Sequence, residues 1–169
     1  MLGNMAEYCV VPEACVVSVD KDHDFKAAAL VGCGVTTGVG AAIKTAEVKP
    51  GSTVAVWGCG GVGLNVIQGA RIAGAAKIIA VDLSAERMEM ARAFGATDVI
   101  NPESDAFKQV LEMTDGIGVD YCFEVVGNGK LIEACFKATR FGGTTILVGV
   151  GRADDRFSIN AMIVPFSSK

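Results

Sequence analysis

A glycine-rich stretch, G-C-G-G-V-G at Gly58–Gly63, has the residue types and spacing that can hold phosphate groups. It directly follows an apolar run at Thr53–Trp57 that is typical of a buried strand, and a helical pattern follows over 62–73. Backbone N–H groups at such a strand-to-helix turn, together with the helix dipole, bind a pyrophosphate without cationic side chains. In a chain with 21 glycines the pattern alone is weak, but this context predicts a dinucleotide site.

The glycines of this loop have separate predicted roles. Gly58 permits the tight turn, Gly60 lets the backbone approach the pyrophosphate, and Gly63 lets the helix pack closely on the strand. Gly61 and Val62 lie between them at the start of the helix, and we expect both to contact the cofactor as well.

An acidic residue follows at the distance that a dinucleotide site requires. Asp82 ends the next apolar run, Lys77–Val81. Its carboxylate is expected to accept hydrogen bonds from the adenosine ribose and to repel a 2′-phosphate, which predicts NAD rather than NADP. Arg87 lies about one helical turn beyond Ser84, a predicted N-cap. It is expected either to reach the ribose or to be an ordinary solvated helix residue.

A second glycine-rich stretch, L-V-G-C-G-V-T-T-G-V-G at Leu30–Gly40, does not fit this pattern. Its glycines Gly32, Gly34 and Gly38 have a different spacing, and no strong apolar run precedes them. No acidic residue ends a strand at the right distance after them. We therefore expect no second nucleotide loop there.

The elements that must position these residues alternate regularly along the chain. Runs rich in β-branched residues alternate with helical patterns of about 10 residues, which is typical of a parallel sheet covered by helices on both faces. The sequence therefore predicts an α/β fold, a Rossmann-type doubly wound parallel sheet of about five strands. The predicted strands are Thr53–Trp57, Lys77–Val81, Thr97–Ile100, Val119–Val126 and Thr144–Val150.

The first 50 residues predict a different organisation. The segment Tyr8–Val19 predicts two short strands on either side of a proline and a glutamate. Phe25–Val31 predicts a short helix that ends before Gly32, and 36–48 predicts a second helix that ends at K-P-G.

Composition excludes several classes of protein. The chain has 169 residues, of which 51% are apolar and 20% charged, so it can bury one sizeable core and is not a disordered chain. A net charge of −4 argues against a nucleic-acid surface. No apolar run reaches about 18 residues, so no membrane span is predicted. The N-terminus lacks the basic and apolar regions of a secretory signal.

The cysteines predict neither disulfides nor a complete metal site. The chain has six cysteines and a single histidine, and no two cysteines form a C-x-x-C pair. We expect reduced thiols in a cytoplasmic protein, most of them small core residues. A zinc site needs three or four converging ligands, so one is hard to assemble from these residues. The cysteines are Cys9, Cys15, Cys33, Cys59, Cys122 and Cys135.

Ordered motifs along the chain carry a specific resemblance. They are G-C-G-V-T-T-G-V-G-A-A at 32–42, G-S-T-V-A-V-W-G-C-G-G-V-G at 51–63, I-I-A-V-D at 78–82, F-G-A-T-D-V-I-N-P at 94–102 and F-E-V-V-G at 123–127. Together they resemble the zinc-containing medium-chain alcohol dehydrogenases. Within that family they are closest to the class of animal alcohol dehydrogenase and of glutathione- or mycothiol-dependent formaldehyde dehydrogenase. The resemblance implies hydride transfer between an alcohol and NAD, with zinc as a Lewis acid.

The resemblance also implies roles for particular residues. Cys33 matches a ligand of the catalytic zinc, and Thr37 matches a residue that packs near the nicotinamide, here a catalytic candidate. Val62 matches the valine behind the nicotinamide ring, and Val148 and Val150 match the stretch whose backbone meets the carboxamide. The implied cofactor roles of the loop glycines agree with those predicted above.

The sequence also departs from the family. The other zinc ligands, the four-cysteine zinc lobe and the start of the proton relay lie in an N-terminal domain that has no counterpart here. The resemblance therefore implies that 1–31 is a remnant of the catalytic domain and that 32–169 is a cofactor domain truncated at its C-terminus. We expect NAD binding, no activity of the chain alone, and self-association through exposed strand edges. A small alcohol or aldehyde would be a substrate only with the missing domain.

Other interpretations remain open at this point. A non-catalytic NAD-binding module would carry the same loop. A Rossmann-type methyltransferase usually has an acid at the end of its first strand, where this chain has Trp57. We further expect Cys33 to be a partly exposed thiol at a helix N-terminus, which would lower its pKa. Cys59 matches a variable position, and we give it no catalytic role.

Overall fold

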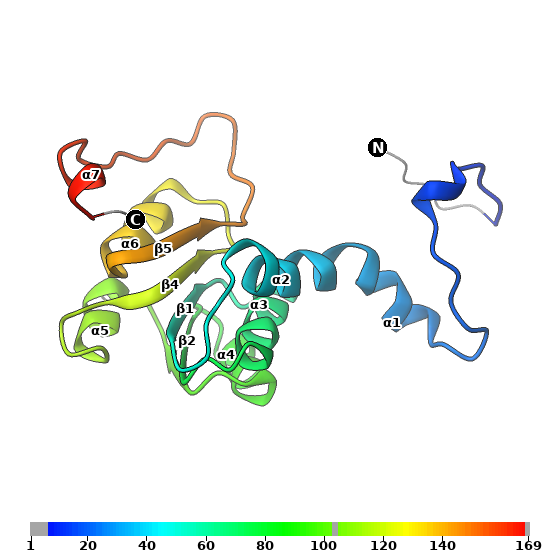
Figure 1. The fold of residues 1–169 in the computed structure, drawn as a ribbon, viewed down its shortest axis with the longest axis horizontal. Coiled ribbons are helices and arrows are strands. Elements are labelled where there is room, and N and C mark those ends of the chain that lie inside the picture. The colour runs from blue at the N-terminus through cyan, green and yellow to red at the C-terminus, as the bar shows by residue number, and fades with distance from the viewer. Residues whose placement is uncertain (1–6, 103–104, 168–169) are drawn as a thin grey trace.

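The centre of the structure is a parallel sheet of five strands (Figure 1). The computed structural model describes residues 7–102 and 105–167, so the first six residues, on which the secretory-signal prediction depends, lie outside the described part. All neighbouring strands pair in parallel, in the order β3-β2-β1-β4-β5. The strands are β1 (Thr53–Trp57), β2 (Lys77–Val81), β3 (Asp98–Ile100), β4 (Val119–Glu124) and β5 (Thr139–Leu147).

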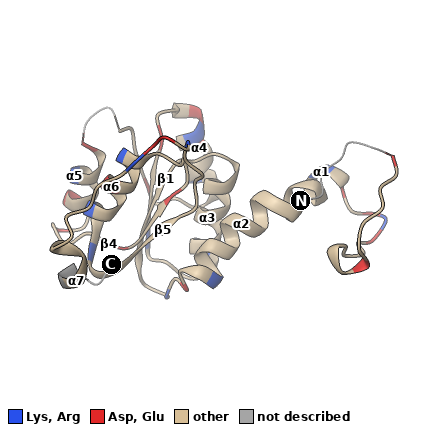
Figure 2. Ribbon diagram, turned by 90° about the horizontal axis from the view of Figure 1, so that it is seen from above, with Lys and Arg blue, Asp and Glu red and all other residues tan. Residues whose placement is uncertain are grey.

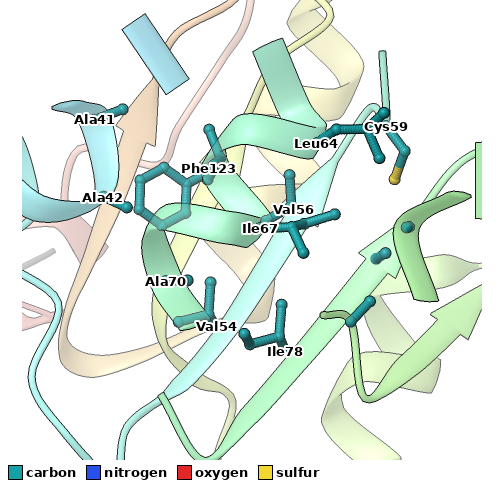
Figure 3. Close-up of a cluster of buried hydrophobic side chains, with 14 of the residues drawn as sticks. Ala41, Ala42, Val54, Val56, Cys59, Leu64, Ile67, Ala70, Ile78 and Phe123 are labelled. Atoms are coloured by element: carbon teal, nitrogen blue, oxygen red, sulfur yellow. The ribbon is translucent and has the colours of Figure 1, made fainter. Parts of the chain in front are cut away.

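Helices cover both faces of this sheet because the side chains of each strand alternate between them. On β1, Val54 and Val56 face a cluster that includes residues of α3 (Gly61–Ile72) and α4 (Ala85–Phe94), as Figure 3 shows in part. Ala55 and Trp57 face the opposite cluster. That second cluster includes residues of α5 (Ala106–Glu112) and α6 (Gly129–Ala138). The predicted doubly wound α/β fold is confirmed.

The prediction of two separate helices before β1 was wrong. Residues Phe25–Thr45 form one continuous helical stretch, made of α1 (Phe25–Leu30), a π-helical turn Val31–Val35, α2 (Thr36–Gly40) and a second π-helical turn Ala41–Thr45. Its glycines do not break it, and one of them, Gly38, permits close packing on α3. A Cβ atom on Gly38 would lie 2.5 Å from the carbonyl oxygen of Val62.

This continuous helix also changes the expectation about membrane spans. By length and composition alone, Phe25–Thr45 could cross a membrane, whereas the sequence prediction had divided the stretch near Gly32. Its second half instead packs on α3, where a Cβ atom on Gly69 would lie 2.9 Å from that of Ala42. Its first half extends away from the sheet domain in both views (Figures 1 and 2).

The N-terminal segment does not form the two strands expected at Tyr8–Val19. Its described residues contain a single 3₁₀ turn, Glu13–Cys15, and no strand. The segment lies apart from the sheet in Figure 1. A strand needs a neighbouring strand to form hydrogen bonds with, and no strand lies beside the described residues of this segment. Its β-propensity alone is therefore not enough to make it a strand.

The last strand lies earlier in the sequence than predicted. β5 begins at Thr139, immediately after α6, and ends at Leu147, so Val148 and Val150 lie beyond it. A register irregularity between Val119 and Tyr121 of β4 accommodates the glycines within β5. The predicted strand Thr144–Val150 was therefore correct in its centre and wrong at both ends.

A carboxylate joins the first residues of β1, β4 and β5. Asp120 Oδ2 accepts hydrogen bonds from the backbone N–H and the hydroxyl of Thr53, at 2.7 and 2.9 Å. Its Oδ1 accepts one from Arg140 Nε at 2.6 Å. Burial alone would raise the pKa of Asp120, but the hydrogen bonds from Thr53 and Arg140 hold that pKa below its ordinary value of 3.8.

We expect the fold to lose stability when Asp120 is protonated. Since its pKa is lower in the folded than in the unfolded state, its stabilisation is fully present above about pH 4 and is lost as the pH falls through the folded-state pKa. Asp120→Asn should lower the free energy of unfolding at neutral pH by about 1–2 kcal/mol, because hydrogen bonds to a charged acceptor are lost. Urea denaturation at neutral and acidic pH measures both effects.

Asp154→Asn is the matched control. Asp154 also pairs with an arginine, Arg152, but both side chains are largely exposed. Such pairs contribute little, so this variant should unfold like the unchanged protein at every pH. Equal stability of the Asp120→Asn variant and this control at neutral pH would contradict the role assigned to Asp120.

Candidate functional site

The carboxyl ends of the parallel strands bring the candidate residues to one edge of the sheet. Gly58 follows β1, Asp82 follows β2, and Val148 follows β5. The order of the strands reverses at β1, which lies between β2 and β4. In open α/β sheets the crevice at this position is where ligands bind.

The glycine loop after β1 is closed toward the sheet and open on its outer side. Gly58 has a φ of 96°, and a Cβ atom on Gly63 would lie 1.8 Å from the carbonyl oxygen of Gly58. The tight turn and the close helix–strand packing predicted for these two glycines are therefore present. A Cβ atom on Gly60 or Gly61 would meet no atom within 4 Å. The backbone here is accessible to a ligand.

The N-terminus of α3 faces this open side of the loop. Gly60 is its N-cap residue and provides no side-chain cap for the first turn. The first N–H groups of any helix lack partners within the helix and carry partial positive charge. A 12-residue helix that begins in an open glycine loop can thus hold a phosphate group.

Asp82, directly after β2, is hydrogen-bonded to the glycine loop. Its buried carboxylate accepts a hydrogen bond from Cys59 N at 2.8 Å and one from Ser84 N at 2.9 Å. Arg87 Nη1 lies 3.8 Å from Asp82 Oδ2, and the Arg87 side chain is mostly exposed. Each carboxylate oxygen can accept more than one hydrogen bond, so Asp82 keeps capacity for a ligand.

A cavity of about 480 Å³ lies beside Asp82, in the size range of small-molecule sites. Its walls are mainly apolar and come from the ends of β1 and β2, the start of α4 and the loop after β4. The residues around it are Trp57, Gly58, Val81, Asp82, Leu83, Ser84, Glu86, Arg87, Pro102, Val126 and Leu131.

Cys59 is inside the loop but is not placed to react. Its side chain is fully buried, and burial and the neighbouring Asp82 raise the pKa of the thiol to about 12. A thiol that stays protonated is neither a nucleophile nor a metal ligand. This agrees with the absence of a catalytic role expected for Cys59.

Glu124, at the end of β4, organises the other side of this sheet edge and was missed from the sequence. Its fully buried carboxylate accepts hydrogen bonds from Val126 N and Gly127 N, at 2.9 and 2.8 Å from Oε1. The motif F-E-V-V-G looked like the continuation of a strand. The signal was an acid in an apolar run with a glycine three residues later.

The segment that contains Val148 and Val150 contacts the loop after β4. The backbone N–H of Val148 donates to the carbonyl oxygen of Glu124 at 2.8 Å, and Val150 is almost fully exposed. A Cβ atom on Gly127 would lie 2.4 Å from the carbonyl carbon of Val150, so the two loops are in close backbone contact.

Cys33 and Thr37 lie on the helical stretch Phe25–Thr45, and both are exposed. Cys33 is well inside this stretch, so the expectation that it stands at a helix N-terminus was wrong. Thr37 precedes Gly38, the residue that contacts α3 at Val62. Thr37 and Val62 are thus brought to the same end of α3. Neither Cys33 nor Thr37 lines the cavity beside Asp82.

Metal ligands do not converge on Cys33. Over residues 7–102 and 105–167, no group of three or more histidine, cysteine, aspartate or glutamate side chains is placed to hold a metal ion. Zinc sites in proteins use three or four such ligands. The described residues therefore do not form a zinc site by themselves.

Comparison with known proteins adds a family match. A family model described as zinc-binding dehydrogenase matches residues 61–167. The chain is 47% identical to S-(hydroxymethyl)glutathione dehydrogenase of Saccharomyces cerevisiae, in an alignment that covers 92% of this chain and 42% of that protein. The chain thus spans less than half the length of this relative.

Solved structures give the same result. Benzyl alcohol dehydrogenase from Acinetobacter calcoaceticus superposes with a TM-score of 0.85 at 34% identity, over 90% of this chain and 42% of that one. A protein described as a zinc-binding dehydrogenase, from Sinorhizobium meliloti 1021 and bound to NADP, superposes with a TM-score of 0.72 at 27% identity. That match covers 80% of this chain and 41% of the other.

Proposed function

The chain belongs to the zinc-binding dehydrogenase family, and we propose that it is the NAD-binding part of an alcohol dehydrogenase-like oxidoreductase. The observation that carries this proposal is the open glycine loop at the start of α3, tied to Asp82 by the 2.8 Å hydrogen bond from Cys59 N. When bound, the dinucleotide supplies the hydride acceptor for oxidation of an alcohol.

The two halves of the cofactor would lie on opposite sides of the loop. The cavity beside Asp82 would take the adenosine, and the backbone at Gly60 and Gly61 would take the pyrophosphate. From the pyrophosphate, the nicotinamide half would extend over the ends of β4 and β5, toward Val148 and Val150. Val62 and Thr37, at the same end of α3, would border that half.

We propose NAD rather than NADP because of the charge at Asp82. A 2′-phosphate on the adenosine ribose would bring negative charge against a buried carboxylate. Arg87 offsets this only partly, since it is largely exposed and 3.8 Å away. Because the similar protein from Sinorhizobium meliloti 1021 is bound to NADP, binding of NADP is the alternative that an experiment must test.

Oxidation of an alcohol would need more than the residues described here. Cys33 would be one zinc ligand, but no second and third ligand accompany it among residues 7–102 and 105–167. We therefore propose that the chain alone binds the cofactor without turning over an alcohol. The same observation supports the alternative of a non-catalytic NAD-binding module.

A glycine substitution tests where the pyrophosphate binds. Gly60→Ala should leave stability unchanged, because its Cβ atom meets open space, and should weaken NADH binding about tenfold by occupying the space next to the backbone. The fluorescence of Trp57, the single tryptophan and a cavity residue, reports the binding. Gly40→Ala, also in open space but outside the loop, is the control and should bind NADH normally. Equal affinities of the two variants would count against this site.

Cofactor choice is tested by parallel titrations. We expect the unchanged protein to bind NADH at least about tenfold more tightly than NADPH, because the carboxylate of Asp82 repels the 2′-phosphate. The same tryptophan signal measures both dissociation constants. NADPH affinity equal to or tighter than that of NADH would refute the choice of NAD.

Turnover by the purified chain is the third test. With NAD, an alcohol such as ethanol and added zinc, we expect no NADH to accumulate, because a specific zinc site needs three or four ligands and none of the described residues form such a group. A full-length alcohol dehydrogenase is the positive control. Zinc-dependent NADH formation by this chain would contradict the proposed inactivity.

A further inference from the structure

A buried carboxylate at the end of β4 accepts hydrogen bonds from the protein backbone through both of its oxygens. Glu124 is fully buried. Its Oε1 accepts from Val126 N and Gly127 N, and its Oε2 accepts from Gly127 N at 3.0 Å. Burying a carboxylate is costly unless hydrogen bonds compensate it. The carboxylate and the loop that follows β4 are therefore held together as one unit.

The backbone of the same residue holds a second loop. The carbonyl oxygen of Glu124 accepts from Val148 N at 2.8 Å and from Gly149 N at 3.0 Å. A Cβ atom on Gly149 would lie 2.1 Å from Gly127 N, and one on Gly127 would lie 2.4 Å from the carbonyl carbon of Val150, so this close backbone contact requires glycine at both positions. Through its side chain and its carbonyl group, Glu124 thus fixes the positions of both loops.

These two loops lie on the side of the sheet where the proposed function puts the nicotinamide. Asp82 organises the loops on the adenosine side in a similar way, through Cys59 N and Ser84 N. Loops that are already fixed lose little conformational entropy when a ligand binds. Displacing the loop after β4 would move the segment Val148–Val150 with it.

From this geometry we infer that Glu124 is a positioning residue for the nicotinamide half of the dinucleotide. It acts through the loops after β4 and β5 and does not touch the cofactor. This inference rests on the proposed function. Its distinctive consequence is that a change at Glu124 affects the nicotinamide half of the ligand and leaves the adenosine half bound normally.

Two ligands separate these halves. ADP-ribose carries the adenosine and the pyrophosphate but no nicotinamide, whereas NADH carries all three. In Glu124→Gln, the amide oxygen can still accept from Val126 N and Gly127 N as Oε1 does. The amide nitrogen that replaces Oε2 is a donor, however, so it cannot accept from Gly127 N and would set two N–H donors against each other. We expect NADH affinity to fall about tenfold and ADP-ribose affinity to change by less than about twofold. Isothermal titration calorimetry measures both ligands on the full chain.

Asp120→Asn is the matched control, since Asp120 is also a hydrogen-bonded carboxylate of β4 but lies at its opposite end. It should reduce stability without changing the ratio of NADH to ADP-ribose affinity. A general loss of stability therefore cannot imitate the expected result for Glu124→Gln.

The outcomes separate this inference from the proposed function. If the unchanged protein binds neither ADP-ribose nor NADH, the proposed function is wrong and the inference falls with it. If it binds ADP-ribose, the inference alone is overturned by any of three results. These are equal affinity for the two ligands, equal loss of both in Glu124→Gln, and no loss of either.

If the Glu124→Gln variant does not fold, a measurement on the unchanged protein can still test the inference. Hydrogen exchange should be slow at the amides of Val126 and Gly127 without any ligand, because the carboxylate of Glu124 already holds them. Exchange as fast as at exposed Gly151 would show that the loop is not held, and would overturn the inference.

Discussion

A single hydrogen bond, from the backbone N–H of Cys59 to the buried carboxylate of Asp82 at 2.8 Å, connects the parts of the candidate site. It joins the loop after β1 to the end of β2, and the close contact of Gly63 with Gly58 fixes the same loop against α3. With the loop held on its inner side, the backbone at Gly60 and Gly61 is left open. Glu124 repeats this arrangement at β4, so two buried carboxylates at the ends of parallel strands shape the whole edge.

The glycines of the two glycine-rich stretches have different structural roles. In Gly58–Gly63 the missing side chains permit a turn, a close helix and an open phosphate-sized surface. In Leu30–Gly40 the glycines lie inside a helix, where they are normally unfavourable. Gly38 compensates by letting this helix approach α3 at Val62. The helix therefore places Cys33 and Thr37 near the start of α3, although among residues 7–102 and 105–167 no set of zinc ligands converges there.

Much of the fold and the core of the site could be predicted from the sequence, because local patterns determine them. Residues that are close in sequence determine where β1 and β2 lie and how Gly58, Gly63 and Asp82 are spaced. The predictions were wrong where contacts between residues far apart in the sequence determine the structure. The helix continues through Gly32 and packs on α3 only further along, at Gly38. The described residues of Tyr8–Val19 have no strand beside them, and the role of Glu124 depends on backbone groups that fold back onto it.

The central claim is that a dinucleotide binds across the open glycine loop between Asp82 and the loops after β4 and β5. The most direct measurement is the change in backbone amide chemical shifts when NADH is added to the isotope-labelled chain. The claim predicts the largest changes at Gly60, Gly61 and Val62, with further changes at Ser84 and at Gly149–Gly151. Changes confined to other parts of the chain, such as the exposed half of the Phe25–Thr45 helix or α5, would contradict it.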